Sequence, residues 1–439
     1  MNNTPTDNFG YSPQDFVKFK RYAWRYLLMF SFLYCTLYCC RLNLSNASAV
    51  MMADLGWTKA DIGILTGTLF WTYGIGQIVN GRLSEIVGPT RFVFFAVLLS
   101  AVANIFFSFQ TSIFAMAVLW GINGFFQSMA WTPGLATLTK WWPGNTRGFA
   151  TGFAHAFSGF GQVAATLSVA FAFAAFPEMG WRAAFIVPAA FPLVMVIIYK
   201  VFAKPAPSAV GLPEYTENTE EMAKNEITMQ EIVRTRGKFY PYKYILSNRR
   251  FNLWMVVAFA TGLARYGLVT WVPLYFIDQF GIKITDGLLS SLALPVGMGI
   301  GTLVVPWLSD YLYLNNRIKA CVHSAIVGAV AVYVFFLLDP TVMWELVLIE
   351  ILLFVAGFCI YAINGTAWAF ATDIGARVFS GTAAGCLNFC AYMGAAVQSL
   401  LYGFLLDAGG WSIVFISIAA FCGLITFLGI ISTTCKAAH

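Results

Sequence analysis

The stretch GRLSEIVGPTR at residues 81–91 separates two long apolar runs, and a weaker copy, WLSD, stands at residues 307–310. The acidic residues of the two copies are 225 positions apart. Arg41 and Arg265, which both lie inside apolar runs, are 224 positions apart. The acidic residues and the arginines are thus separated by nearly the same number of positions. This common spacing predicts two parallel repeats of similar length.

The composition is that of a membrane protein. Of the 439 residues, 59% are hydrophobic and only 10% are charged, and the mean hydropathy is +0.72. A soluble protein of this length carries about 25% charged residues. Many apolar runs reach the roughly 20 residues that a helix needs to cross a bilayer, so an all-α membrane protein is expected. Runs this strong argue against an outer-membrane barrel, whose strands alternate.

Twelve apolar runs predict twelve transmembrane helices in two pseudo-symmetric six-helix bundles. The predicted spans are 24–47, 60–82, 91–109, 112–139, 147–173, 181–202, 251–277, 286–309, 318–338, 342–372, 379–406 and 411–434. The corresponding division is an N-terminal segment (1–23), a first bundle (24–202), a linker (203–250), a second bundle (251–434) and a tail (435–439).

Lysine and arginine gather in the loops on the side of both termini, and the opposite side has only Lys59, Arg182 and Lys283. This bias predicts a multi-pass protein of the plasma (inner) membrane with both termini and the linker in the cytoplasm. The polar residues 1–23 are unlike a cleavable signal. Because the basic residues are scattered over short loops, no nucleic-acid partner is expected. The expected partners are the lipid bilayer and a small anion, and the chain is expected to be monomeric.

Arg41 and Arg265 are the residues most informative about function. A charge near mid-bilayer costs about 3 kcal/mol or more, and arginine does not lose its proton. No acidic residue lies in the interior of either span. Both arginines are therefore expected to face a wet cavity and to bind the oxygens of a phosphate, sulfonate or carboxylate. The alternative is a structural arginine bonded to backbone carbonyls.

Polar and aromatic side chains recur at helical spacing near these arginines. Tyr34, Tyr38 and Arg41 share one face of the first span, which suits an oxyanion or is a packed aromatic stripe. His155 could strengthen anion binding when protonated, or could be an ordinary core histidine. The remaining candidates lie on polar stripes, which also serve as helix-helix contacts, or follow from aligning the repeats: Gln77, Trp131, Tyr361, Asn388 and Tyr392.

The loop at residues 81–91 and its echo resemble the signature loop of the major facilitator superfamily, over about residues 20–435. Further motifs resemble the organophosphate:phosphate antiporter family, which includes glycerol-3-phosphate and hexose-phosphate transporters: Tyr38 to Arg41, Ala154-His155, Arg265-Tyr266-Gly267, Trp271 to Tyr275 and Gly381 to Gly385. The resemblance implies two rocking bundles, phosphate binding by Arg41 and Arg265 with help from His155, and a cavity lined by Tyr38, Trp131, Tyr361 and Tyr392.

Three positions depart from the family pattern. Gln77 stands where members commonly have lysine, Leu42 where a lysine often follows the first arginine, and Thr270 where an acid follows the second. The site is therefore less charged than in the family. A monoanion, or an anion with a larger apolar part, fits such a site as well as a sugar phosphate does.

These features predict a secondary transporter of a small, organophosphate-like organic anion that works by alternating access, with Arg41 and Arg265 clamping the anion. Exchange of anions is expected. The alternatives are proton-coupled symport of a carboxylate or sulfonate, and a transporter-like membrane sensor of a sugar phosphate. The sequence has no nucleophile–base pair within the spans, and its nine cysteines lack metal-ligand spacing with histidine. We therefore expect no enzyme activity, metal or cofactor.

Overall fold

The computed structural model describes residues 11–142, 144–213, 231–232, 234–237, 239–314, 316–374 and 376–434. All regular structure within these ranges is helical. Residues 1–10, 214–230 and 435–439, which belong to the predicted N-terminal segment, linker and tail, lie outside the described residues.

The helices follow one another with short connections. The first half contains α1 (Pro13–Leu37), the 3-10 turn η1 (Tyr38–Cys40), α2 (Asn43–Leu55), α3 (Lys59–Val87), α4 (Pro89–Ser108), α5 (Ile113–Ser128), α6 (Trp131–Trp141), α7 (Gly144–Ala175) and α8 (Ala183–Phe202). The second half contains α11 (Arg249–Phe280), α12 (Ile284–Ser290), α13 (Ala293–Tyr311), α14 (Arg317–Phe336), α15 (Met343–Ile374), α16 (Ala376–Gly409) and α17 (Trp411–Thr434), and the short α10 (Tyr240–Leu246) precedes it.

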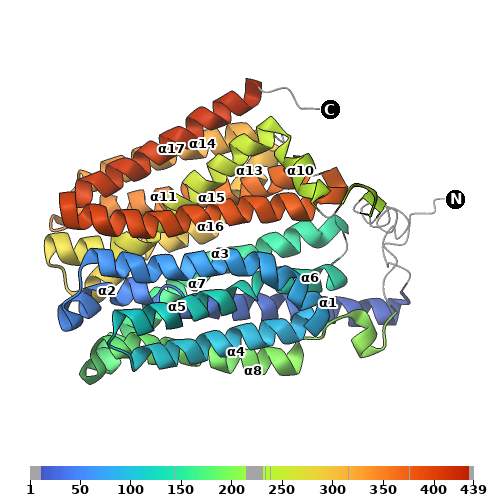
Figure 1. Cartoon of the computed structure of the whole chain (residues 1–439), viewed down its shortest axis with the longest axis horizontal. Coiled ribbons are helices and arrows are strands. Elements are labelled where there is room, and N and C mark those ends of the chain that lie inside the picture. The colour runs from blue at the N-terminus through green and yellow to red at the C-terminus, as the bar shows by residue number, and fades with distance from the viewer. Residues whose placement is uncertain are drawn as a thin grey trace.

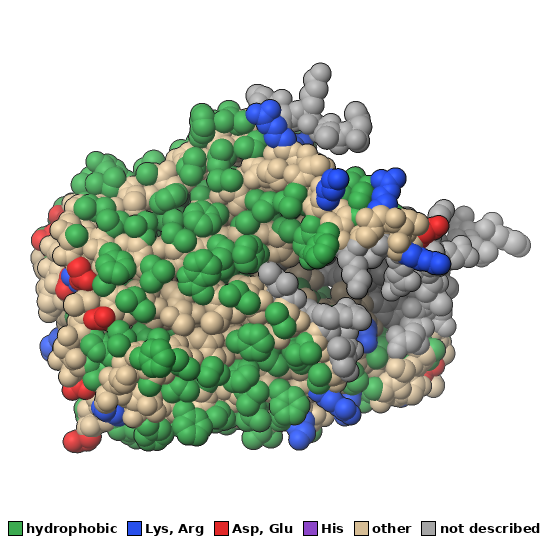
Figure 2. All heavy atoms as spheres, in the orientation of Figure 1, with side chains coloured by type: hydrophobic (Ala, Val, Ile, Leu, Met, Phe, Trp, Pro, Cys, Tyr) green, Lys and Arg blue, Asp and Glu red, His purple; other side chains and the backbone are tan. Residues whose placement is uncertain are grey.

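The predicted helical membrane fold is confirmed. Eleven stretches of the described residues are long and apolar enough to cross a membrane, and the 29-residue α3 lies where the remaining span was predicted. The surface agrees, because Figure 2 shows hydrophobic side chains over the middle of the molecule. Large exposed apolar residues occur on both halves, among them Phe114, Phe171, Ile197, Phe427 and Ile430. A surface this apolar suits contact with lipid rather than water.

The two halves lie side by side, with α1 to α8 in the lower part of Figure 1 and α11 to α17 in the upper part. They meet through α3 against α16, α7 against α13, and α2 against α11. The backbones come close at Gly159 of α7, where an added Cβ would lie 2.3 Å from the Cα of Gly299 in α13. Only glycine fits such an approach.

The start of α1 and the end of α17 lie at one end of the molecule (Figure 1), and lysine and arginine side chains gather there (Figure 2). The opposite end, called the far end below, contains the connections from α2 to α3 and from α16 to α17. At this end, local capping residues determine where α2 ends and where α3 begins. Gly56 in the left-handed conformation ends α2, and Thr58 with Asp61 forms a capping box that starts α3.

Three of the predicted spans are each one apolar stretch long enough to cross a membrane, but the helix within each of them is interrupted. The span predicted at 24–47 is interrupted between Leu37 and Asn43, the one at 112–139 between α5 and α6, and the one at 286–309 between α12 and α13. The first interruption places Tyr38 and Arg41 on a 3-10 turn and at its end rather than on a regular helix.

Amide side chains from neighbouring helices stabilise the first interruption. The carbonyl oxygen of Cys40 accepts hydrogen bonds from Asn104 Nδ2 (3.2 Å), Asn123 Nδ2 (2.8 Å) and Gln127 Nε2 (3.0 Å). The carbonyl of Leu37 accepts from Gln127 Nε2 at 3.2 Å. A break inside a membrane is tolerated only where such groups replace the lost helical bonds. These amides thereby position Arg41.

The substitution Gln127→Leu is expected to destabilise the protein by about 2 kcal/mol, because it leaves buried polar groups unpaired. Gln127 also accepts a hydrogen bond from Arg41 Nε at 2.7 Å, so the loss affects the break and the arginine together. Thermal unfolding of the purified protein measures the effect. Gln110→Leu is the control: Gln110 is half-buried and its side chain makes only a long, solvent-exposed hydrogen bond to the carbonyl of Phe106, so stability is expected to change by less than about 0.5 kcal/mol. Equal unfolding temperatures for both variants would contradict this role of Gln127.

Candidate functional site

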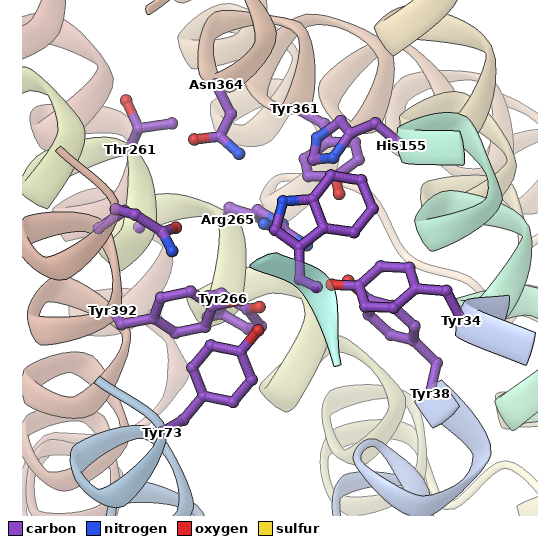
Figure 3. Close-up of a pocket in the computed structure, with 14 residues that line it drawn as sticks. Tyr34, Tyr38, Tyr73, His155, Thr261, Arg265, Tyr266, Tyr361, Asn364 and Tyr392 are labelled. Atoms are coloured by element: carbon purple, nitrogen blue, oxygen red, sulfur yellow. The ribbon is translucent and has the colours of Figure 1, made fainter. Parts of the chain in front are cut away.

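A small cavity of about 30 Å³ lies between the two halves, midway along the helices. Its lining from the first half is Tyr34, Tyr38, Tyr73, Trp131 and His155. Its lining from the second half is Thr261, Gly262, Arg265, Tyr266, Tyr361, Asn364, Asn388, Ala391 and Tyr392. This space holds about one or two waters, so a substrate requires the lining side chains to move apart. Figure 3 shows these side chains converging from helices of both halves.

Among the described residues that line the cavity, Arg265 is the one with a permanent positive charge. It lies on α11 and is 6% exposed. Its guanidinium carbon lies 3.9 Å from the ring centre of Tyr361 and 4.5 Å from that of Tyr266. Its Nε and Nη2 atoms have no hydrogen-bond partner among the described residues. Aromatic faces offset part of the cost of burying the charge, but two donors remain available for an anion.

Arg41 lies one layer behind the cavity wall. Its guanidinium carbon is 4.7 Å from the ring centre of Tyr38 and 4.8 Å from that of Tyr73, and both rings line the cavity. Gln127 accepts a hydrogen bond from its Nε, while both terminal nitrogens lack partners among the described residues. The side chain is 3% exposed and is not among the residues that line the cavity. The two phenol rings therefore separate this charge from the space beside Arg265.

An aromatic group joins the halves on the other side of Arg265. The His155 ring lies 5.4 Å from the ring of Trp131 and stacks on that of Tyr361 at 5.5 Å. Ser158 and Tyr361 share a hydrogen bond between their hydroxyls, which connects α7 with α15. His155 Nε2 has no partner within the part of the chain that the structure describes. A ligand group or water could bond to it.

Phenols supply most of the remaining polar surface of the cavity. In Figure 3 the hydroxyls of Tyr34, Tyr38, Tyr73 and Tyr266 point toward the middle of the space. Tyr73 packs on Tyr392 of the other half with ring centres 4.2 Å apart. Hydroxyl groups donate to anionic oxygens without adding charge. Together with Arg265 they form a site with one buried positive charge, many neutral donors, and no acidic residue among the described lining.

Most of the candidate residues from the sequence come together in this cavity. Arg265, His155, Tyr34, Tyr38, Trp131, Tyr361, Asn388 and Tyr392 all line it. Arg41 lies behind it. Gln77 is not among the lining residues either, because its Oε1 atom accepts a hydrogen bond from Thr132 Oγ1 of α6 at 3.2 Å.

The sequence candidates did not include Thr261, Gly262, Tyr73, Tyr266, Asn364 or Ala391, which also line the cavity. Three of them carried a usable signal. Asn364 follows Tyr361 by three positions on the polar stripe of its span. Thr261 precedes Arg265 by one helical turn and shares its face. Tyr73 lies on the predicted polar stripe of its span. Tyr266, next to Arg265 in sequence, carried none, because adjacent residues of a helix point in different directions.

A second, smaller chamber of about 20 Å³ lies along α11 beyond Arg265. Val269 and Pro273, one and two turns further along α11, line it together with Asn46, Gln162 and Thr166 from the first half. The Gln162 Oε1 atom is buried without a partner among the described residues. The described walls of this chamber combine a few polar side chains with apolar ones and contain no charged residue, and the chamber lies on the far-end side of the cavity.

Comparison with known proteins gives matches over most of the chain. The model of the family described as Major Facilitator Superfamily matches residues 30–397. A probable hexose phosphate transport protein of Chlamydia trachomatis is 27% identical over 95% of this chain and 92% of its own length. A glycerol-3-phosphate transporter of Bacillus subtilis is 28% identical over 88% of this chain and 87% of its own length.

Solved structures match in fold. A bacterial homologue of the human lysosomal transporter Spinster, crystallised in an inward-facing and unoccupied conformation, aligns with a TM-score of 0.74. The alignment covers 97% of this chain and 98% of that one at 14% identity. At this identity the likeness concerns the fold alone.

Proposed function

The chain belongs to the Major Facilitator Superfamily, and on that premise we propose that it carries a small organophosphate-like anion across the membrane by alternating access. It is a multi-pass membrane transporter, and the resemblance to organophosphate transporters noted from its sequence is confirmed by its relatives. The observation that carries the proposal is Arg265, a buried cation with two unpartnered donors in a cavity between the halves.

An anionic group fits this site because it removes an electrostatic cost that the empty protein bears. A buried arginine without a counter-ion is unfavourable in a membrane protein. A phosphate oxygen can accept from the two free donors of Arg265 and from nearby phenols, and such charge-assisted bonds are about twice as strong as neutral ones. The aromatic walls formed by Tyr34, Trp131 and Tyr361 pack against the organic part of the substrate.

Arg41 is proposed as the second half of an arginine clamp. Its terminal nitrogens have no hydrogen-bond partner among the residues that the structure describes, and they lie behind Tyr38 and Tyr73. Turning either ring aside would open these donors to the cavity. A bound anion would then bridge an arginine from each half. A ligand that binds this bridged state more tightly shifts the equilibrium toward it.

For orientation, we propose that the end with the termini faces the cytoplasm and the far end faces outward across the plasma (inner) membrane. The gathering of lysine and arginine at the termini supports this assignment. The first bundle (24–202) and the second bundle (251–434) rock about the central cavity, joined by the linker (203–250). One chain contains both halves of the site, which agrees with a monomer.

The proposed ligand class is tested by thermal unfolding of the purified protein with phosphate esters, phosphonates, sulfonates and carboxylates in turn. A ligand at 100 times its Kd stabilises the folded state by about 2.7 kcal/mol. We expect phosphate esters to raise the unfolding temperature most. A larger shift with carboxylates than with any phosphorus compound would contradict the proposal.

Exchange is the expected mode of coupling, because two unbridged arginines resist closure of the empty cavity. Uptake of a phosphate ester into proteoliposomes should rise when phosphate or the same ester is inside, and it should not follow an imposed pH gradient. Proton symport through His155 predicts the reverse. Uptake that follows the pH gradient and ignores the internal anion would overturn exchange, and in that case His155→Gln should abolish the pH response.

A further inference from the structure

At the far end, an acidic residue of the second half caps a helix of the first. Asp407, near the end of α16, accepts hydrogen bonds from the backbone N–H groups of Lys59 (3.2 Å, to Oδ1) and Ala60 (2.9 Å, to Oδ2). These are the first two N–H groups of α3, which no carbonyl within the helix can satisfy. A carboxylate is also favoured at this position by the helix dipole. The contact exists only while the halves touch at this end.

A second charged contact crosses the same boundary. Lys59 Nζ lies 2.9 Å from Asp278 Oδ2 at the end of α11, with the two side chains 18% and 30% exposed. Trp411 Nε1 of α17 donates to the same oxygen at 2.7 Å. Lys59 therefore connects the first half to Asp278 with its side chain and to Asp407 with its backbone. The partial burial of the pair reduces screening by solvent.

The internal repeat indicates why Asp278 has a partner in the other half. Its counterpart 224 positions earlier is Asp54, which accepts from Trp181 Nε1 at 2.9 Å and lies 3.9 Å from Arg182. All three belong to the first half. In the second half Trp411 takes the place of Trp181, but the residue after it is Ser412 rather than arginine. Asp278 thus lacks a same-half cation at this position, and Lys59 supplies the charge across the boundary.

Close backbone packing surrounds these contacts. An added Cβ on Gly63 of α3 would lie 2.4 Å from the carbonyl oxygen of Ser399 in α16 and 3.3 Å from the Cα of Gly403. One turn of α3 beyond Lys59, the two helices therefore approach as closely as backbones can. This packing holds α3 and α16 together directly beside the solvent-exposed contacts of Asp407.

We propose that Lys59, Asp278 and Asp407 form a latch that holds the far end closed and breaks whenever the cavity opens to that side. The role of this latch in alternating access rests on the proposed function. Its closing action follows from contacts that need no substrate. These residues act as positioning residues, because they set which end of the cavity is closed and do not touch the cavity itself.

Hydrogen exchange of the full-length protein, measured by mass spectrometry without ligand, tests the latch. In Asp407→Asn and Asp278→Asn, amides 59–67 of α3 are expected to exchange about tenfold faster, the effect of losing a charged hydrogen bond. Amides of α14 (Arg317–Phe336) are the internal reference and are expected to exchange as in the unmodified protein. Unchanged exchange of amides 59–67 in both variants would overturn the latch.

Two further variants separate the latch from general loss of stability. Asp54→Asn breaks the equivalent contacts within the first half and is expected to leave amides 59–67 unchanged. An equal increase in this control would overturn the proposal. The double variant Lys59→Asp with Asp278→Lys reverses the ion pair and is expected to restore slow exchange, whereas continued fast exchange would show that the pair does not hold the end closed. Because no substrate is used, these results are independent of the transport and ligand-binding tests.

Discussion

Arg265→Gln is expected to lower the affinity for a phosphate ester by about 100-fold, which corresponds to nearly 3 kcal/mol for the loss of one partner of a charged hydrogen bond. The same substitution removes a buried charge whose Nε and Nη2 donors have no partner in the described part of the chain. The unliganded variant should therefore be as stable as the unmodified protein or more stable. Isothermal titration with a hexose phosphate measures the first effect, and thermal unfolding measures the second.

Two variants calibrate this result. Arg265→Lys keeps the charge but loses the planar fork, so its affinity should lie between those of the unmodified protein and Arg265→Gln. Arg182→Gln removes an exposed arginine at the far end and should leave the affinity unchanged. Equal affinity for Arg265→Gln and the unmodified protein would remove Arg265 from the binding site.

Gly159→Val is expected to reduce transport at least about tenfold, because overpacking of a tight contact costs about 1–3 kcal/mol. The added Cβ would lie 2.3 Å from the Cα of Gly299 in the other half. The substitution therefore disfavours the arrangement in which α7 and α13 touch, and a carrier that cannot populate this arrangement completes its cycle slowly. The initial rate of uptake into proteoliposomes measures the effect.

Gly152→Val is the matched control on the same helix. A Cβ at Gly152 meets no atom within 4 Å among the described residues, so transport should continue at close to the unmodified rate. If both valine variants transport equally well, the contact between α7 and α13 does not form part of the cycle. If both fail, the loss comes from valine in α7 and the Gly159 prediction is wrong.

The membrane fold and the position of Arg265 could be predicted from the sequence. Both follow from where long apolar runs occur along the chain and from the charge that lies inside one of them. A guanidinium inside an apolar run has few acceptable surroundings, so Arg265 was expected in a cavity and is found there. His155 and Asn388, whose positions correspond in the repeat, also meet at this cavity. The internal repeat therefore indicated which residues of different spans lie near one another, and the sequence of a single span does not contain this information.

The interruption of the first span could not be predicted in this way. Residues 37–42 contain neither glycine nor proline, which usually mark a break. The break depends on amides of Asn104, Asn123 and Gln127, which come from helices that are distant in sequence. Tertiary contacts therefore override the local preference for helix.

The same contacts explain why Arg41 is placed differently from Arg265. On a continuous helix, Arg41 would share the face of Tyr34 and Tyr38 and reach the cavity with them. The 3-10 turn rotates it, and Gln127 then holds its Nε behind the ring of Tyr38. Spacing along the chain predicted a common face, whereas the broken helix separates the arginine from its neighbours.

Uptake of a labelled hexose phosphate into proteoliposomes tests the central proposal most directly, with phosphate or sulfate enclosed in matched vesicles. We expect saturable uptake by the unmodified protein with phosphate inside, and the protein-free rate with Arg265→Gln. A protein that binds phosphate esters but transports none of them with either anion inside would be a membrane sensor, and that result would contradict the proposed function.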